Sequence, residues 1–259
     1  MAWTTRRGLT AAVVLGVCIL TGCSTGAAAT TVRETLAVTP LISITTLRSP
    51  QQTAAFTPPP PAAAGPDPRA VADYFAEIAF GSEFGESDQR IHKWTHNPRI
   101  TVHGSPTPAD SATLARVIHD LNDIIGLIEL ELVPAGGDID LHFVPEHEFP
   151  SITDNYVAGN IGFFSTWWNG RGEMTRGRVL VSTTIREQSL RDHTIREEIT
   201  QALGLAQDSY TYPESIFHQE ISTATEFSAI DRGVIEMLYR PEVVPGMNRD
   251  QAFAALNVV

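Results

Sequence analysis

Apolar residues recur every three or four positions in four stretches of the chain. Asp67, Thr107 and Ser228 stand immediately before three of these stretches, where a short polar side chain can cap the first turn of a helix. Pro68 stands at a first helical position, which tolerates proline because that amide has no partner within the helix. The fourth stretch runs from about residue 184 to residue 203. The pattern therefore predicts four helices, each with one buried face.

Between these helices the pattern changes to alternation of apolar and polar residues or to short apolar runs, both typical of β-strands. Pro134 with Gly136 and Gly137 indicates a turn between the second and third strands, and residues 169–172 form another turn. The order helix, strand, helix, strands, long helix, loop, helix predicts an α+β or α/β fold with one mixed, twisted sheet and a capped C-terminal helix. The expected strands span residues 99–102, 128–133, 138–144, 161–168 and 178–183.

The first 22 residues have the layout of a signal peptide. Arg6 and Arg7 are followed by an apolar run at residues 9–20, which is too short to be a comfortable transmembrane helix. The run ends in Leu-Thr-Gly before Cys23, which resembles the lipobox of bacterial lipoproteins. We therefore expect residues 1–22 to be removed and Cys23 to be lipidated. A lipid anchor places the protein at the extracytoplasmic face of the cell membrane; a non-lipidated signal peptide is the alternative.

Residues 23–65 are rich in Ala, Thr and Pro and carry no helical or alternating pattern. Such a segment cannot bury enough apolar surface to order itself, so we expect a disordered spacer. The prolines at residues 58–61 favour an extended conformation and make the spacer semi-stiff. Residues 66–259 then form one domain, and the hydrophobic content of 42% is sufficient for a single core.

Charge and cysteine content narrow the classes of function. The sequence has 18 Lys and Arg against 30 Asp and Glu, a formal net charge of −12. An acidic surface repels phosphate, which argues against nucleic acid as a partner and against lipid binding by the domain itself. Contact with the membrane is expected through the lipid anchor alone. The two cysteines, Cys18 and Cys23, both lie at the N-terminus, which excludes a cysteine metal site or nucleophile in the domain.

The stretch at residues 193–208 indicates chemistry. Zincin peptidases place H-E-x-x-H on a helix, because residues four apart share a face and two imidazoles can then bind one zinc ion. The glutamate of that motif is the general base. The present stretch resembles this layout with altered ligands. Glu197 stands at the first histidine position, Glu198 at the base position and Gln201 at the second histidine position.

The stretch also resembles the continuation of the motif in metzincins. Gly204 stands where the chain turns back, and Gln207 or Asp208 stands where a third ligand follows. An all-oxygen set of Glu197, Gln201 and Asp208 would suit a harder divalent ion such as calcium or manganese, since a glutamine amide is a poor zinc ligand. His193, one turn before Glu197 on the same side of the helix, is a substitute ligand, and His218 and Glu220 could serve in the same way. Because both motif histidines are missing, we expect no cofactor, with a divalent metal as the alternative.

A closer resemblance is to a family of uncharacterised bacterial lipoproteins that is grouped with zincin-like proteins. The family has no assigned activity, so the resemblance implies a zincin-like fold with a degenerate H-E-x-x-H motif. The shared motifs are I-A-F-G-S-E-F at residues 78–84, K-W-T at 93–95, R-E-E-I-T-Q-A-L-G-L at 196–205, E-S-I-F at 214–217 and L-Y-R-P at 238–241.

Three functions follow from these observations. The leading hypothesis is a membrane-tethered lipoprotein whose degenerate zincin-like cleft binds a protein, a peptide or an envelope component. The first alternative is an active metallohydrolase with Glu198 as general base and non-standard ligands. The second is a structural lipoprotein, in which Glu197 and Gln201 face solvent or belong to a polar network that ties the glycine turn to the helix. Trp94, Trp167 and Trp168 could line a binding groove, although aromatic side chains more often pack in the core or in strands.

Overall fold

In a computed structural model of the chain, the described residues are 65–81, 89–220 and 222–258. They lie in one compact unit, residues 59–259. The expectations for the leader, for Cys23 and for nearly all of the spacer fall outside them. Within the described ranges, no helix is both long and apolar enough to cross a membrane.

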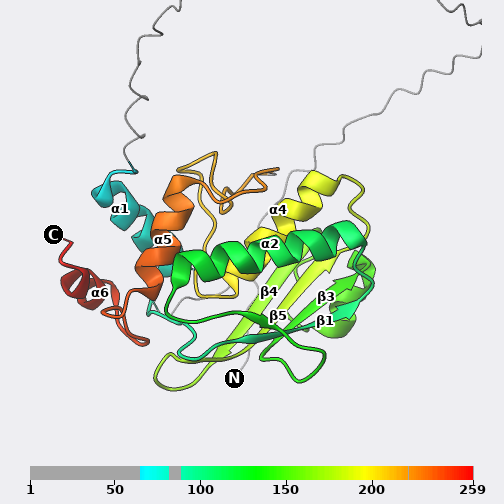
Figure 1. Cartoon of the computed structure of the whole chain (residues 1–259), viewed down its shortest axis with the longest axis horizontal. Helices are drawn as coiled ribbons and strands as arrows, with labels where there is room; N and C mark the ends of the chain where they lie inside the picture. The colour runs from blue at the N-terminus through cyan, green and yellow to red at the C-terminus, as the bar shows by residue number, and fades with distance from the viewer. Residues whose placement is uncertain (1–64, 82–88, 221, 259) are drawn as a thin grey trace, which may run out of the picture. The chain divides into compact units, whose positions relative to one another are not determined.

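Helices and strands follow one another along the described chain in the predicted overall order, and Figure 1 shows their arrangement. The elements are α1 (Pro68–Ala79), β1 (Arg99–Gly104), α2 (Pro108–Ile125), β2 (Glu131–Leu132), β3 (Ile139–Val144), the 3-10 helix η1 (Glu146–Glu148), α3 (Phe149–Ile152), β4 (Gly162–Trp168), β5 (Met174–Ser182), α4 (Gln188–Gln201), α5 (Ala229–Tyr239) and α6 (Arg249–Leu256).

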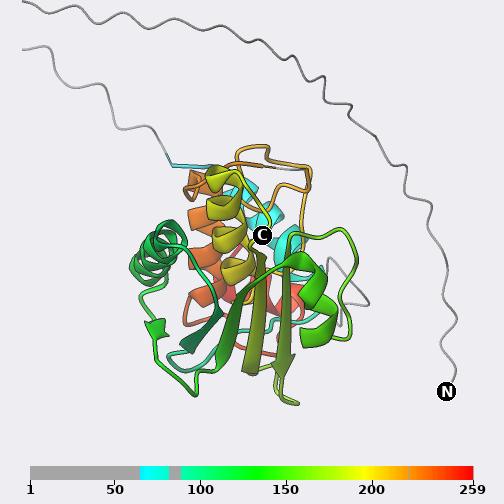
Figure 2. The same cartoon turned by 90° about the vertical axis from the view of Figure 1, so that its right-hand side faces the viewer.

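The five strands form one mixed sheet in the order β2-β1-β3-β5-β4. β1, β2, β3 and β5 are parallel, and β4 pairs antiparallel with β5 at one edge. Helices α2 and α4 lie across one face of the sheet (Figure 1), and Figure 2 shows α3 on the opposite side from α2. The predicted fold class is therefore confirmed: an α+β domain with a single mixed sheet, a long helix against the sheet and a capped helix near the C-terminus. The antiparallel pairing of the edge strand β4 is seen only in the structure.

The predicted helix starts are confirmed. The side chain of Asp67 accepts a hydrogen bond from the first turn of α1. Thr107 with Asp110 and Ser228 with Asp231 form reciprocal capping boxes at the starts of α2 and α5, in which each side chain accepts from the other residue's backbone amide. These caps fix the residue at which each of the three helices begins.

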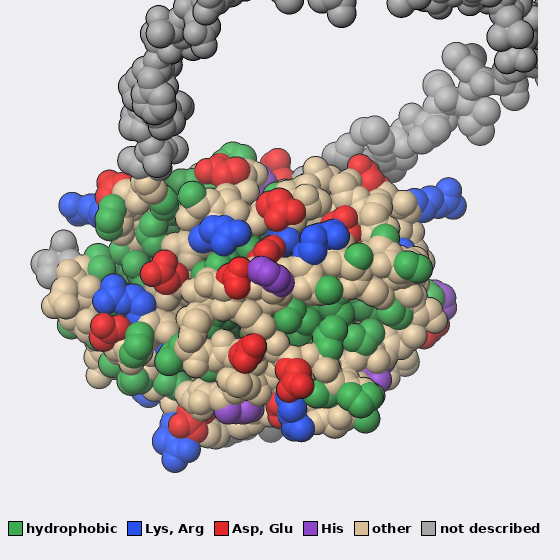
Figure 3. All heavy atoms as spheres, viewed as in Figure 1, with side chains coloured by type: hydrophobic (Ala, Val, Ile, Leu, Met, Phe, Trp, Pro, Cys, Tyr) green, Lys and Arg blue, Asp and Glu red, His purple; other side chains and the backbone are tan. Residues whose placement is uncertain are grey.

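The main core lies between the sheet and the helices that cover it. The alternation predicted for β3 is confirmed, since Ile139, Leu141 and Phe143 are buried on the helix side. A smaller cluster of Phe149 and Leu180, with Phe163 from β4, fills the other side of the sheet beneath α3. Charged side chains of both signs are interspersed over the outer surface that carries α2 (Figure 3).

Several boundaries differ from the expectation. The strand expected at residues 128–133 is only two residues long and pairs with β1 in parallel, so Pro134 to Gly137 does not close a hairpin. Instead this segment crosses the beginning of β1. The Gly137 amide donates to Thr101 Oγ1 at 2.8 Å, and an added Cβ at Gly137 would lie 2.7 Å from the Arg99 carbonyl oxygen. The glycine therefore serves a close crossing between parallel strands.

Further differences concern where two elements begin and which helices are present. β5 begins at Met174 rather than Arg178, because its first half pairs with β4 in a hairpin. α4 begins at Gln188 rather than near residue 184. Two helices, α3 and α6, were not expected; α6 nevertheless has a capping box in which Asn248 pairs with Gln251.

Candidate functional site

Helix α4 is buried around more of its circumference than its charged sequence suggests. Ile195 and Ile199 face the core as predicted. Arg196 is 0% exposed; its guanidinium donates to Asp120 Oδ2 of α2 at 2.8 Å and lies 4.4 Å from the ring centre of Phe227. The charged residues therefore fix α4 between α2 and the chain that leads into α5, and this side of the helix is not a solvated face.

The opposite side of α4 borders a cavity of about 250 Å³. The loop before β4 and the chain after α4 form its other walls. Gln207, the alternative third ligand, does not line this cavity; its Nε2 donates to the Asp208 carbonyl oxygen at 3.0 Å. The other residues predicted for the site, with the substitute ligands of the following loop, all line it: His193, Glu197, Glu198, Gln201, Asp208, His218 and Glu220. The structure thus brings together residues that the sequence could only place on one helix face and in the loop beyond it.

His193 is tied to two acceptors. Its Nε2 lies 3.3 Å from Glu197 Oε2, and its Nδ1 lies 2.9 Å from the Ala224 carbonyl oxygen. Burial lowers the pKa of His193, but the hydrogen bond and charge of Glu197, together with the Ala224 carbonyl and the charge of Asp231, raise it by more in sum, and the pKa ends above its usual value. Both ring nitrogens are therefore engaged by acceptors that favour the protonated form.

Gln201 and Asp208 form the second pair of the cavity. Gln201 is 1% exposed, and its Nε2 donates to Asp208 Oδ1 at 2.7 Å. This bond joins the last residue of α4 to the chain beyond Gly204. The polar network between helix and glycine turn, one of the alternatives for these side chains, is therefore present, and solvent exposure of Gln201 is wrong.

The residues present do not fit a bound metal. The Glu197 carboxylate is paired with His193, and Gln201 directs its amide nitrogen, not its oxygen, toward Asp208. Across residues 65–81, 89–220 and 222–258, no group of three His, Cys, Asp or Glu side chains is arranged to hold a metal ion. Two local pairs replace the converging ligand set that H-E-x-x-H provides.

Two glycines shape the cavity. Glu198 is 7% exposed and faces the first residue of β4, Gly162, where an added Cβ would overlap the Glu198 carboxylate. Gly204 has a φ of +121°, and a Cβ there would overlap the carbonyl oxygen of His92. Both positions depend on the missing side chain: one gives the Glu198 carboxylate its place beside the edge strand, and the other turns the chain back after α4.

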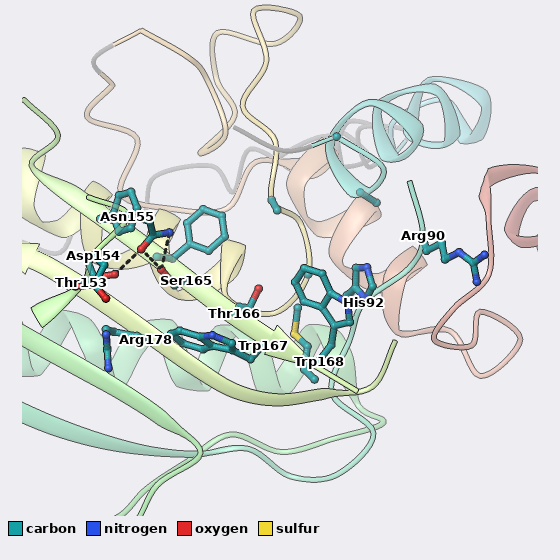
Figure 4. Close-up of a pocket in the computed structure, with 17 residues that line it drawn as sticks. Arg90, His92, Thr153, Asp154, Asn155, Ser165, Thr166, Trp167, Trp168 and Arg178 are labelled. Atoms are coloured by element: carbon teal, nitrogen blue, oxygen red, sulfur yellow. Dashed lines mark hydrogen bonds between the residues drawn. The ribbon is translucent and has the colours of Figure 1, made fainter. Parts of the chain in front are cut away.

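A second cavity, of about 430 Å³, continues along β4 from Phe163 to Trp168 (Figure 4). Gly204 and Ala206 line it opposite the strand, so both cavities lie between β4 and the chain that ends α4 and follows it. Trp168 stacks on the ring of His92 with 3.9 Å between ring centres. We refer to the two cavities together as the edge groove.

Two roles were expected for the tryptophans, packing in the core and lining a groove, and the structure shows both. Trp94 is 0% exposed and donates from Nε1 to the Ala202 carbonyl oxygen, so it belongs to the core. Trp167 and Trp168 are 40% and 46% exposed and line the edge groove.

The backbone of β4 offers hydrogen-bonding groups to the edge groove. The amide of Ser182 donates to the carbonyl of Ile161 at 2.8 Å, which makes these two residues a hydrogen-bonded antiparallel pair. Such pairs alternate along the ladder, so Phe163 and Ser165 also bond to β5. The amides and carbonyls of the residues between them, Gly162, Phe164 and Thr166, consequently point away from β5 toward the open edge.

The described residues thus form a mixed α+β domain in which cavities lie between the antiparallel edge strand β4 and helix α4 with the chain that follows it. The chain belongs to the family described as protein of unknown function, DUF2927, whose model matches residues 68–258.

Comparison with known structures finds weak similarity to solved structures of myroilysin. One solved myroilysin structure matches with a TM-score of 0.38 and 13% sequence identity over 57% of this chain and 82% of that chain. Another matches with the same TM-score and identity over 68% of this chain and 96% of that chain. A search of curated proteins finds no match to this sequence.

Proposed function

We propose that the protein is a lipid-anchored, extracytoplasmic lipoprotein whose zincin-like domain binds a peptide, or an extended segment of a protein, in the edge groove. The observation that carries this proposal is the position of the groove. It follows an edge strand whose residues Gly162, Phe164 and Thr166 direct backbone groups outward, and an extended chain can pair with such an edge while its side chains enter neighbouring pockets.

The residues that line the groove favour binding of a ligand over its cleavage. Trp168 and His92 offer a stacked aromatic surface at one end, and Glu198 lies at the other end beside Gly162. Aromatic side chains supply much of the binding energy at peptide-binding surfaces because they bury large areas with little loss of conformational freedom. Glu197, which stands at the position of a zincin's first zinc ligand, is paired with His193.

The membrane tether is supported by the sequence alone. The positive start, the short apolar run and the small residues before Cys23 agree in position and order with a lipoprotein leader. The Pro-rich segment that follows is long enough to let the domain reach ligands away from the membrane surface. The domain's acidic composition is consistent with attachment through the anchor rather than through its own surface.

The first experiment selects ligands and then tests strand pairing. Short peptides from a random displayed library are selected on the full-length chain purified in detergent, and the affinity of a selected peptide is compared between wild type, Thr166→Pro and Thr166→Ala. Proline removes the outward amide of Thr166 without removing a bond to β5, and edge strands accept proline at such positions. We expect Thr166→Pro to weaken binding about tenfold, the effect of losing roughly one good hydrogen bond of ~1.4 kcal/mol.

Thr166→Ala is the matched control, because it keeps the amide and removes only the side chain. Equal affinity of all three proteins for the selected peptides would contradict strand pairing. Stoichiometric zinc in the purified chain, together with hydrolysis that is lost in Glu198→Gln, would establish the metallohydrolase alternative instead.

A further inference from the structure

Arg178 of β5 is a half-buried arginine that forms no ion pair with a carboxylate in the described part of the chain. It lines the larger cavity of the edge groove, and Figure 4 shows it beside Trp167. The other described arginines that are buried or half-buried each pair with a carboxylate: Arg191 with Asp110, Arg196 with Asp120 and Arg240 with Glu242. In a sequence with 30 acidic residues against 18 basic ones, the missing partner of Arg178 points to an anion supplied from outside the domain.

The contacts of Arg178 leave its charge uncompensated. One guanidinium nitrogen, Nη1, donates to the carbonyl oxygen of Ile152, a neutral acceptor, and Nε is buried without an acceptor among the described residues. Asp140 lies next to Arg178 in the ladder between β3 and β5. Its carboxylate is instead bonded to His103 at 2.9 Å and to Arg176 at 3.3 Å. The carboxylate nearest in register is therefore already engaged elsewhere.

Neutral hydrogen-bonding groups lie at the same end of the cavity as Arg178 (Figure 4). Ser165 Oγ lies 3.4 Å from Asn155 Oδ1, and Asn155 Nδ2 lies 3.5 Å from Ser165 Oγ. Hydrogen bonds of this length are weak, so the hydroxyl and the amide can turn to donate to a ligand. Asp154 is the one acidic residue among the described lining residues, and it is exposed. The surroundings of Arg178 thus favour an acceptor that carries negative charge.

Arg178 is also aligned with the position of a ligand strand. The ladder pairs Arg178 directly with Ser165 of β4, and paired residues direct their side chains to the same face of the sheet. A strand on the open edge of β4 would place one residue next to Ser165, with its side chain on the face of Arg178. That strand would lie about 9.6 Å from β5, two strand spacings. An arginine and an acidic side chain together span this distance, and the short side chain of Ser165 leaves the space between them open.

We infer that the peptide bound in the edge groove carries an acidic residue, aspartate or glutamate, whose carboxylate binds Arg178 across Ser165. The inference rests on the proposed function, because it names the class of peptide that the groove takes. A carboxylate accepts two parallel hydrogen bonds from a guanidinium, which a neutral amide of the same shape cannot match in charge. Since the protein as a whole is acidic, a ligand carboxylate is favoured at this one position and repelled elsewhere.

The test uses a series of acetylated and amidated peptides of alternating threonine and valine, with one glutamate moved through each position in turn. The matched series carries glutamine, which has nearly the shape of glutamate but no charge. Affinities are measured for the full-length chain, for Arg178→Gln, and for Arg116→Gln, whose exposed side chain lies on α2. We expect glutamate at one register to bind about tenfold more tightly than glutamine, as a charge-assisted pair should. This preference should vanish in Arg178→Gln and persist in Arg116→Gln.

A second variant leaves Arg178 in place, so the test does not depend on the folding of the arginine variant. Ser165→Asp puts a carboxylate of the protein itself next to Arg178 on the half-buried edge strand. We expect it to abolish or reverse the preference for glutamate, because the guanidinium is then already paired. Ser165→Asn is the matched control, and it should keep the preference.

The outcomes separate the inference from the proposed function. If glutamate and glutamine peptides bind equally well at every register, and Thr166→Pro still weakens both, the groove binds peptides and the acidic subsite is wrong. If the preference for glutamate is unchanged in Arg178→Gln and Ser165→Asp, the carboxylate binds elsewhere and the inference fails. Tight binding only by peptides with a free C-terminus would assign Arg178 to a terminal carboxylate and overturn the acidic side chain. If no peptide of either series binds and library selection also fails, the proposed function itself is refuted.

Discussion

At the scale of single residues, Gly204 shows how one backbone conformation determines the shape of the site. Its φ of +121° belongs to a region that side-chain-bearing residues rarely adopt, and the His92 carbonyl fills the space that a Cβ would need. The turn allows Asp208 to meet Gln201, so the closure of the groove depends on this glycine.

Replacement of Gly204 should therefore destabilise the domain. We expect Gly204→Val to lower the free energy of unfolding by about 1 kcal/mol or more, with a clear fall in Tm. Gly170→Val is the control, because an added Cβ at Gly170 would meet no atom within 4 Å. Thermal unfolding of both variants checks the prediction, and a Tm for Gly204→Val equal to that of wild type would refute it.

Lys93 is the sequence's single lysine, and it is buried. Its Nζ donates to the Leu238 and Arg240 carbonyl oxygens at 2.9 and 3.3 Å, where helix α5 ends and a cation is favoured. Burial nevertheless lowers the pKa of Lys93 to about 8. Protonated Lys93 thus destabilises the folded state relative to the unfolded chain, in which its pKa is the ordinary 10.5.

The sign of this effect predicts how stability depends on pH. Between the folded pKa of about 8 and the unfolded value of 10.5, the unfolded chain binds more protons at Lys93, so stability rises with pH. Denaturant unfolding at several pH values should show wild type gaining up to ~1.4 kcal/mol per pH unit relative to Lys93→Met in this window. Parallel curves for the two proteins would show that Lys93 has its ordinary pKa in the folded state.

At the scale of elements, the sequence predicts most of β4 and α4 but not their relation. The strand expected at residues 161–168 is found at Gly162–Trp168, since an aromatic run before a glycine turn is a strong local signal. Its place at the sheet edge depends on which strands pair, and pairing joins residues far apart in the chain. The groove, which exists only because β4 is an edge beside α4, was therefore not predictable from local pattern.

Helix α4 also has features that depend on residues far away in the chain and that local sequence pattern cannot predict. Its apolar face at Ile195 and Ile199 follows from helical spacing, and the site residues on the other face follow from the zincin resemblance. The burial of Arg196 does not follow from the sequence, because an arginine on a helix is expected at the surface unless Asp120 and Phe227 are known to cover it. The surroundings of His193 do not follow from the sequence either, because its Nδ1 contacts the carbonyl oxygen of Ala224 in a distant loop.

At the scale of the whole molecule, we propose that the domain with the edge groove is attached to the membrane by a lipid anchor. If Cys23 carries the lipid, Cys23→Ser should release the protein from the membrane fraction or leave an unprocessed precursor, because the thiol at the acylation position is lost. Fractionation of cells with and without detergent measures this. Membrane association of the mutant that is unchanged and still depends on detergent would contradict the anchor.

The central claim is that an extended ligand pairs with the open edge of β4. Amide hydrogen exchange of the full-length chain, followed residue by residue with and without a selected peptide, tests it most directly. Pairing should slow exchange at Gly162, Phe164 and Thr166, whose amides point to the groove, and change Phe163 and Ser165 much less, because these already bond to β5. A peptide that binds tightly but leaves the exchange of all five amides unchanged, or slows them equally, would contradict the account.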